Sequence, residues 1–406
     1  MVNISDRVLS LSASQTLAMS QRSSEMRAQG IDVINLSVGE PDFFTPDNIK
    51  QAAKTAIDDN YSFYSPVPGY MSLREAICDK LKNENHLDYQ PSQIVVSNGA
   101  KQSICQLLLA LVNPGDDVIL PAPYWVSYPE MVKLAGGKPV VIPTDIEHNF
   151  KITPAQLRDA ITEKTRVLIL CSPSNPTGSV YSREELEALA VVLRDFPDVM
   201  IVADEIYEHI NYVGSHVSLA QCEGMKNQVV IVNGVSKGYA MTGWRIGWIA
   251  APEFLAKACS KLQGQFSSGA GSISQKAAEA AYRGSQESVE QMRQAFERRR
   301  DLVVSLARDI DGLRVNKPDG AFYLFPECSS YFGRSDGERV IRSASDLAMY
   351  ILEKGHVAVV DGEGFGASDY IRLSYATSED NIREAMRRMK IALGKLEVNQ
   401  EFGIRN

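Results

Sequence analysis

The sequence predicts an α/β fold, in which helices cover both faces of a mostly parallel sheet, together with a second, smaller α+β domain. Apolar runs without polar alternation occur at residues 167–170, 199–203 and 229–232, and such runs are typical of strands buried on both faces. Helical segments alternate with these runs, which favours a sheet sandwiched by helices. The chain has 406 residues, of which 44% are hydrophobic, and this length favours two domains over one.

The segment before residue 125 is expected to contain three helices and two strands. The helices are expected at residues 51–59, 73–83 and 99–111, and the strands at 93–96 and 117–120. The third helix ends at Asn113-Pro114-Gly115, and Pro121 and Pro123 follow the second strand. Proline removes a backbone donor, so these residues mark the ends of regular elements.

The middle of the chain repeats this order. The strand 167–170 is closed by Ser172-Pro173, and a helix is expected at 183–194. Ser182 is the expected N-cap of that helix, because a serine side chain accepts a hydrogen bond from the free N–H groups of a helix start. The strands 199–203 and 229–232 complete the buried set.

The pattern changes after about residue 280. Residues 285–310 are highly charged and predict a long, exposed connecting helix. The remaining segments predict strands at 320–325, 356–360 and 370–375 and helices at 346–354 and 379–396. We therefore expect a large domain at 41–285 and a small domain made of 1–40 and 286–406, although the return of the N-terminal segment does not follow from pattern alone.

Composition excludes several classes of protein. The net charge is −8 without a basic stripe, so we expect no nucleic-acid partner. The apolar runs are too short to span a bilayer, and residues 1–8 lack the apolar segment of a signal peptide. The six cysteines are scattered without a CxxC pair, and the five histidines lack HExxH spacing. Free thiols, a reducing cytoplasmic location and no metal site are therefore expected.

The segment Ser97-Asn98-Gly99-Ala100-Lys101-Gln102 joins a strand to a helix. The free N–H groups and the dipole of a helix start favour an anion. The segment therefore either binds a phosphate or is an ordinary turn between a strand and a helix. It matches neither a Walker A motif nor GxGxxG, and the glycines of residues 362–366 have the wrong spacing for a dinucleotide fingerprint.

Two charged residues follow the buried strands. Asp204 lies at the carboxyl end of strand 199–203, where open α/β sheets place ligands, and it either binds a cationic group or caps the next helix. Lys237 follows strand 229–232, between Ser236 and Gly238. It is either a Schiff-base amine whose pKa is lowered by partial burial, or a solvated surface charge.

Three further side chains are candidates for ligand contacts. Arg245 lies in an apolar and aromatic segment, so it must pair with an anion, and a phosphate is a good match. Asn175 either donates a hydrogen bond in a cleft or only forms a turn with Pro176. Arg372, in the predicted strand 370–375, either binds a carboxylate in a bidentate way or forms a surface ion pair.

Together these residues supply a phosphate site, a Schiff-base lysine, a carboxylate for a pyridinium and an arginine for an α-carboxylate. Pyridoxal phosphate (PLP) requires this set, because its ring withdraws electrons only while its nitrogen stays protonated. The sequence also resembles the class I aminotransferases of PLP fold type I, especially the bacterial aspartate aminotransferase subgroup. The resemblance rests on segments 39–43, 64–69, 97–102, 124–129, 174–178, 203–207, 236–247 and 372–376, in the order of that family.

The resemblance implies a role for each matching residue around the cofactor. Lys237 would carry PLP as a Schiff base and then move the substrate proton. Asp204 would pair with the pyridinium nitrogen, and Asn175 and Tyr207 would bind the phenolate oxygen. The resemblance assigns the phosphate to Gly99, Ala100, Lys101, Ser236 and Arg245.

The resemblance also implies how the ring, the substrate and a second subunit are bound. Trp125 would flank the cofactor ring, and Tyr64 would reach the phosphate of a neighbouring subunit, which implies a homodimer with shared active sites. Arg372 would bind the substrate α-carboxylate with the help of Gly39, Trp125 and Asn175.

The expected substrates are amino acids and 2-oxo acids, with L-aspartate and 2-oxoglutarate first among them. Lys101 matches the cation that meets the distal carboxylate, with Ser14 and Thr16 nearby, although these two residues are equally explained as helix caps. Prephenate, aromatic or neutral amino acids remain alternatives, as does a C–S lyase reaction on the same fold. A non-catalytic PLP-binding regulator is disfavoured because no basic segment is left for DNA binding, and the missing glycine fingerprint disfavours a nicotinamide dehydrogenase.

Overall fold

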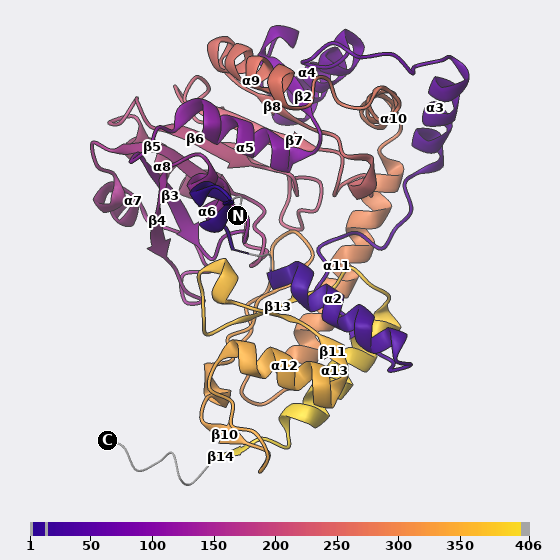
Figure 1. The fold of residues 1–406 in the computed structure, drawn as a ribbon, viewed down its shortest axis with the longest axis vertical. Helices are drawn as coiled ribbons and strands as arrows, with labels where there is room; N and C mark the ends of the chain where they lie inside the picture. The colour runs from indigo at the N-terminus through magenta and orange to yellow at the C-terminus, as the bar shows by residue number, and fades with distance from the viewer. Residues whose placement is uncertain (1–2, 13–14, 399–406) are drawn as a thin grey trace.

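A seven-stranded sheet forms the centre of the larger part of the molecule (Figure 1). The computed structural model describes residues 3–12 and 15–398, and for residues 15–17 only the backbone. The strand order is β2-β8-β7-β6-β5-β3-β4, and β8 runs antiparallel to both of its neighbours while the other pairs are parallel. The strands are β2 (Ile94–Ser97), β3 (Asp117–Ala122), β4 (Lys138–Pro143), β5 (Thr165–Cys171), β6 (Met200–Asp204), β7 (Val229–Gly234) and β8 (Gly247–Ala250).

The apolar runs of the sequence are explained by burial on both faces of this sheet. Within β5, Leu168 and Leu170 face one hydrophobic core, and Val167 and Ile169 face the other. Because successive strand residues point to opposite faces, a strand with a core on each side carries no polar alternation. The predicted parallel, helix-covered sheet is therefore confirmed.

Helices cover both faces of the sheet (Figure 1). One core receives apolar side chains from α3 (Asp47–Asp58), α4 (Met71–Asn85), α7 (Pro154–Ala160), α8 (Arg183–Leu193) and α10 (Ser272–Arg283). The other core receives them from α5 (Ala100–Leu111), α6 (Tyr128–Leu134) and α9 (Glu253–Phe266). Ser182 caps α8 as predicted, since its hydroxyl accepts a hydrogen bond from the Glu185 N–H group.

A smaller sheet of order β12-β13-β9 organises the C-terminal part of the chain. The N-terminal segment returns to this part, because β1 pairs in parallel with β11. The strands here are β1 (Ile34–Asn35), β9 (Tyr323–Leu324), β10 (Arg334–Ser335), β11 (Val357–Ala358), β12 (Val360–Asp361), β13 (Ile371–Ser374) and β14 (Glu397–Val398). The helices here are α2 (Gln15–Ala28), α11 (Glu287–Arg308), α12 (Ala344–Gly355) and α13 (Glu379–Leu393), whereas α1 (Asp6–Leu9) contacts α6 of the larger part.

Helix α11 differs from its prediction. An exposed connecting helix was expected, but one side of α11 is buried, and Met292, Phe296 and Val303 belong to the core of the C-terminal part. These residues recur at helical spacing between the charged ones, so α11 packs one apolar face. One charged residue of the helix, Arg300, is buried as well, and it pairs with Glu297 and Asp301. The same core includes Ile206 and Tyr207 from the segment after β6.

The strands of the smaller sheet are shorter than predicted. Only Tyr323–Leu324 of the segment 320–325 forms a strand, and the segment 356–360 is divided between β11 and β12. No helix of the described residues is long and apolar enough to cross a membrane. All six cysteines are unpaired, as expected; Cys222, Cys259 and Cys328 are buried, and the other three are half-buried.

Candidate active site

The predicted site residues meet at the carboxyl ends of β5, β6 and β7. Asp204 is the last residue of β6, Lys237 follows β7, and Asn175 follows β5. They line one cavity of about 310 Å³. The predicted residues that line it are Gly39, Ala100, Lys101, Trp125, Asn175, Asp204, Tyr207, Ser236, Lys237, Arg245 and Arg372.

Lys237 presents a half-buried amine to this cavity. Its Nζ donates a hydrogen bond to the carbonyl oxygen of Gly39 at 2.6 Å. Burial lowers the pKa of Lys237 to about 8, and the nearby charge of Glu40 only partly opposes this effect. At pH 7 this pKa leaves about a tenth of the amine neutral, and this neutral fraction is nucleophilic.

Asp204 is fixed by two hydrogen bonds. The Tyr128 hydroxyl donates to Oδ2 at 2.5 Å, and the backbone N–H of Ile206 donates to Oδ1 at 3.3 Å. Burial raises the pKa of Asp204 to about 6, although the Tyr128 hydrogen bond lowers it. The carboxylate is therefore charged at neutral pH, and its two hydrogen bonds fix its orientation. Tyr128 was not predicted as a site residue, although it lies in the segment 124–129 that supports the resemblance.

Two hydrogen-bonded pairs complete the inner wall. The hydroxyls of Tyr207 and Tyr323 lie 2.8 Å apart, and burial raises the pKa of Tyr207 well above its usual range, so its proton stays in place. Arg372 donates to Asn175 Oδ1 at 3.0 Å and to the Ser37 carbonyl oxygen at 2.6 Å. Its Nε is buried without a hydrogen-bond partner, so the guanidinium retains donor capacity for a ligand.

The start of α5 is shaped to accept an anion. Gly99, the N-cap of α5, has φ +84°, a conformation that favours glycine. A side chain at this position would collide with the Arg245 guanidinium. The first N–H groups of α5 and the guanidinium therefore face the same space, which suits a phosphate.

The charges of the cavity show what it can bind. Four cationic side chains line it, namely those of Lys101, Lys237, Arg245 and Arg372, against the single carboxylate of Asp204. Among the described side chains, no carboxylate lies within ion-pair distance of Arg245 or Arg372; Arg245 instead donates to the Thr242 and Asn98 carbonyl oxygens. The site therefore fits a ligand with several negative charges, as PLP and a dicarboxylic amino acid have.

Lys101 lines the cavity, whereas the predicted residues Gly99 and Tyr64 do not. Lys101 Nζ lies 4.8 Å from the centre of the Trp125 ring, which holds the ammonium beside the cavity. Tyr64 is 97% exposed and does not line the cavity of its own chain. Ser14 and the side chain of Thr16 lie outside the described residues.

Several lining residues were missed by sequence reasoning. They are Val126, Ser127, Tyr128, Cys171, Ile206, Thr242 and Tyr323. Five of them lie within segments 124–129, 203–207 and 236–247, which support the resemblance, so these segments were the available signal. Tyr323 was different, because it lies in a predicted strand whose facing residues only the fold determines.

Comparison with known proteins identifies the family. The family model described as aminotransferase class I and II matches residues 31–389. The chain belongs to this family. The aminotransferase is 48% identical to a bifunctional aspartate aminotransferase and glutamate/aspartate-prephenate aminotransferase of Petunia hybrida, over 97% of this chain and 83% of that protein. It is 46% identical to an aspartate/prephenate aminotransferase of Nitrosomonas europaea, over 96% of this chain and 99% of that protein.

Solved structures agree with this assignment. The aminotransferase superposes on the aspartate aminotransferase of Rhizobium meliloti with a TM-score of 0.95 and 42% identity, over 98% of this chain and 100% of that one. It superposes on the Thermus thermophilus aspartate aminotransferase with maleate with a TM-score of 0.91 and 40% identity, over 97% and 100% of the two chains. The predicted α/β fold of PLP fold type I is thereby confirmed.

Proposed function

We propose that this aminotransferase transfers the amino group of L-aspartate to 2-oxoglutarate with PLP as cofactor. The observation that carries the proposal is the convergence of an amine, a carboxylate and three further cations on one cavity, with Lys237 and Asp204 at adjacent strand ends. Relatives named aspartate aminotransferase and aspartate/prephenate aminotransferase support the same reaction.

The cavity residues suit distinct parts of the cofactor. When bound, PLP supplies an electron sink that stabilises the negative charge formed at Cα of the amino acid. Asp204 would hold the proton on the ring nitrogen, and Asn175 and Tyr207 would donate to the phenolate oxygen. Trp125 would cover a ring face, and the phosphate would be bound by Gly99, Ala100, Lys101, Ser236 and Arg245.

Lys237 is the proposed general base. Its amine has to accept the proton of Cα and release it again, and a group with a pKa near the working pH does both well. Burial, which lowers the pKa of Lys237 to about 8, therefore suits this role.

Arg372 is proposed to bind the α-carboxylate of the substrate. Its guanidinium is 2% exposed and already held by Asn175 and Ser37, so it is preorganised. Lys101 is proposed to meet the distal carboxylate together with Ser14 and Thr16, and Gly39 to contact the α-carboxylate. Two separated carboxylate sites fix the direction of the Cα–H bond, and such orientation accelerates the reaction.

Prephenate is the second candidate amino acceptor. Relatives named for aspartate and prephenate favour it, and prephenate also carries two carboxylates that Arg372 and Lys101 suit. A single cation at the distal position accommodates either substrate.

The proposal includes the assembly and the setting of the enzyme. Tyr64 is almost fully exposed, and we place it at the phosphate of a partner subunit in a homodimer. We also propose a large domain at 41–285, a small domain at 1–40 and 286–406, and a cytoplasmic location, which the six unpaired cysteines support.

Absorption spectroscopy of the purified holoenzyme tests the function. A visible band should be lost on addition of L-aspartate and restored by 2-oxoglutarate. Prephenate should restore it as well if it is an acceptor. A visible band that persists with aspartate contradicts the substrate, and the absence of any band after incubation with PLP contradicts the cofactor.

Lys101→Ala should lower kcat/KM for aspartate as amino donor more than kcat/KM for alanine. Because alanine has no distal carboxylate, we expect kcat/KM for aspartate to fall about 10-fold further, the size of one hydrogen bond to a charged group. Steady-state kinetics with both donors measure this difference, and Lys138→Ala, an exposed lysine of β4, is the control. Equal losses for the two donors would remove Lys101 from the distal site.

The uptake of PLP by the apoprotein should depend on pH. Burial lowers the pKa of Lys237 to about 8, and only the neutral amine is nucleophilic. The rate constant for uptake should therefore rise between about pH 7 and 8 and level off above the pKa. Stopped-flow fluorescence measures this rate constant. If it still increases about tenfold per pH unit at pH 9.5, the pKa of Lys237 is not lowered.

Tyr128→Phe should lower kcat about 10-fold while KM for aspartate stays unchanged, because it removes a hydrogen bond to the charged Asp204 and no substrate contact. Tyr124→Phe, four residues earlier and outside the cavity lining, is the control. If both variants behave alike in steady-state kinetics, the positioning role of Tyr128 is refuted.

A further inference from the structure

The segment of residues 204–209 separates two cavities. Asp204, Ile206 and Tyr207 line the active-site cavity. Glu208 and His209 line a second cavity of about 440 Å³ behind it. Contacts on the side of this segment that faces the second cavity therefore also determine the direction of the Asp204 and Tyr207 side chains.

The rear side of the segment contacts a group of charged and polar residues, most of them buried. The side chains of Lys80, Glu205, Glu208 and His216 are between 1% and 6% exposed. We call the group the rear cluster, and it consists of Lys80, Glu84, Asn85, Glu205, Glu208, His209 and His216.

Two ion pairs hold the rear cluster together. Lys80 pairs with Glu208, and Asn85 joins them, since it accepts from Lys80 at 2.6 Å and donates to Glu208 at 3.1 Å. His216 lies 3.1 Å from Glu205. Burial opposes a charge on His216, but Glu205 and Glu208 outweigh it and raise the pKa of His216.

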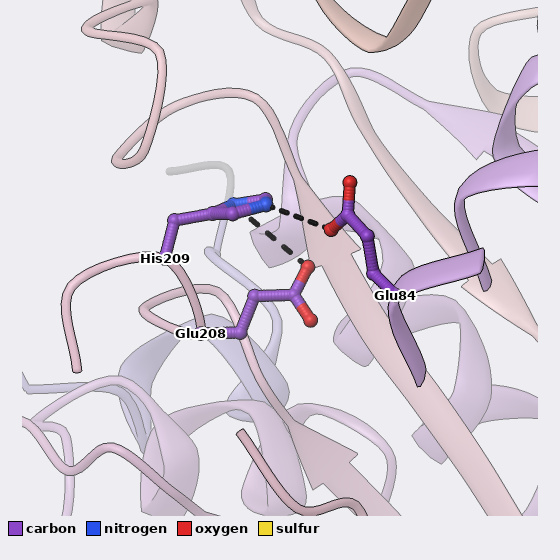
Figure 2. A group of neighbouring side chains, drawn as sticks. All are labelled: Glu84, Glu208 and His209. Atoms are coloured by element: carbon purple, nitrogen blue, oxygen red, sulfur yellow. Dashed lines mark hydrogen bonds and ion pairs between the residues drawn. The ribbon is translucent and has the colours of Figure 1, made fainter. Parts of the chain in front are cut away.

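Metal binding does not explain the cluster, although two groups of its side chains have candidate ligand atoms within 4.8 Å of one another, namely Glu84, Glu208 and His209, and Glu205, Glu208 and His216. Glu208 belongs to both groups. Figure 2 shows the His209 ring facing the carboxylates of Glu84 and Glu208, at 3.1 Å and 3.8 Å from its nitrogens. However, the Lys80 ammonium pairs with Glu208 and lies 3.6 Å from Glu84. The chain itself therefore supplies the cation for these carboxylates.

The rear cluster contacts both the segment that carries Asp204 and Tyr207 and the segment that carries Lys237. Glu205 is joined through its N–H to Val232 of β7 at 2.9 Å. His209 packs against Gly238, the residue after Lys237, so closely that an added Cβ there would lie 2.9 Å from the imidazole Nδ1. The segment that carries Asp204 and Tyr207 and the segment that carries Lys237 thus share one support.

Stability alone is a poor reason for such a cluster. Burying ions costs solvation free energy that their attraction often fails to exceed, and apolar replacements are frequently as stable. A supporting shell around a catalytic site has a different benefit, because it holds the reacting groups within a fraction of an ångström of their working positions.

We propose that the Glu205–His216 pair, with the Lys80–Glu208 pair beside it, is a positioning device that holds residues 204–209 so that Asp204 and Tyr207 face the cofactor. The inference rests on the proposed transamination. Glu205 and His216 touch neither substrate nor cofactor, and they act through the segment between the two cavities.

The variants Glu205→Gln and His216→Gln test this role, because each leaves one buried partner without its counter-charge. We expect kcat to fall about 10- to 100-fold with KM for aspartate within about twofold, since Arg372 and Lys101 lie on other segments. PLP affinity of the apoprotein, measured by fluorescence, should fall as well. The double variant E205Q/H216Q leaves no unpaired charge in this pair and should recover part of the loss.

Hydrogen exchange of the apoprotein distinguishes positioning from general stability. In the single variants, exchange should become faster at residues 205–211 while β5 and β3 keep the wild-type rate. Lys151→Gln, which removes a lysine that pairs with Glu185 far from the rear cluster, is the control and should leave kcat and PLP affinity unchanged. Where a single variant does not fold, the double variant carries the test.

Several results would overturn the proposal. Wild-type kcat and PLP affinity in the variants would do so, as would faster exchange throughout the protein. A wild-type melting temperature that Zn²⁺ raises and EDTA restores, with no response in His216→Gln, would make the rear cluster a metal site instead. If wild-type enzyme fails to transaminate, the proposed function is wrong, and the exchange pattern still decides whether the pair holds the segment.

Discussion

Lys237→Ala should abolish transamination, with kcat lower by about 10⁴-fold, the upper end of the contribution of a general base. The physical reason is that, among the described residues, the only other amine of the cavity lining, that of Lys101, lies over the Trp125 ring and so does not take the place of Lys237.

The fold should survive this change, because the Lys237 amine makes a single hydrogen bond, to Gly39. Arg245 and the start of α5 remain, so the variant should still bind PLP without a covalent bond. Single-turnover mixing with aspartate measures the chemical step, and circular dichroism checks the fold. Lys237→Arg is the matched variant: it keeps the positive charge but not the neutral amine, and it should be equally inactive. Activity near that of wild type in either variant would refute the role of Lys237.

The sequence predicted the large sheet well because each buried strand has an apolar core on both faces. This arrangement produces uninterrupted runs such as residues 167–170 and 229–232, and they became β5 and β7. Strand β8 was not predicted, because its direction is set by pairing with β2 and β7, which are distant in sequence. Local patterns carry no information on such pairing.

The sequence predicted those site residues that lie after the carboxyl ends of the buried strands. Asp204 and Lys237 lie directly after apolar runs, so their meeting follows from the parallel sheet. Tyr128 and the rear cluster were missed for a common reason. Tyr128 lies on α6, and Lys80 and His216 come from separate segments, so only the fold brings these side chains to the residues they hold.

Asp204→Asn has the second largest expected effect, a fall in kcat of about 10²- to 10³-fold, the range found when one preorganised electrostatic partner is removed. The amide is nearly isosteric and keeps the hydrogen bond from the Ile206 N–H. What it lacks is the negative charge that holds a proton on the ring nitrogen. PLP should therefore still bind, while proton removal from Cα becomes slow. Single-turnover kinetics with aspartate measure that step.

A second aspartate of the chain separates the charge of Asp204 from its role as a turn cap. Asp361, at the end of β12, is also buried, its pKa is also raised by burial, and its Oδ1 also accepts from the N–H two residues later. Asp361→Asn removes the same charge from the same local motif away from the cavity lining. If both variants lose activity equally, Asp204 is only a cap; if the loss is confined to Asp204→Asn, its carboxylate acts on the cofactor.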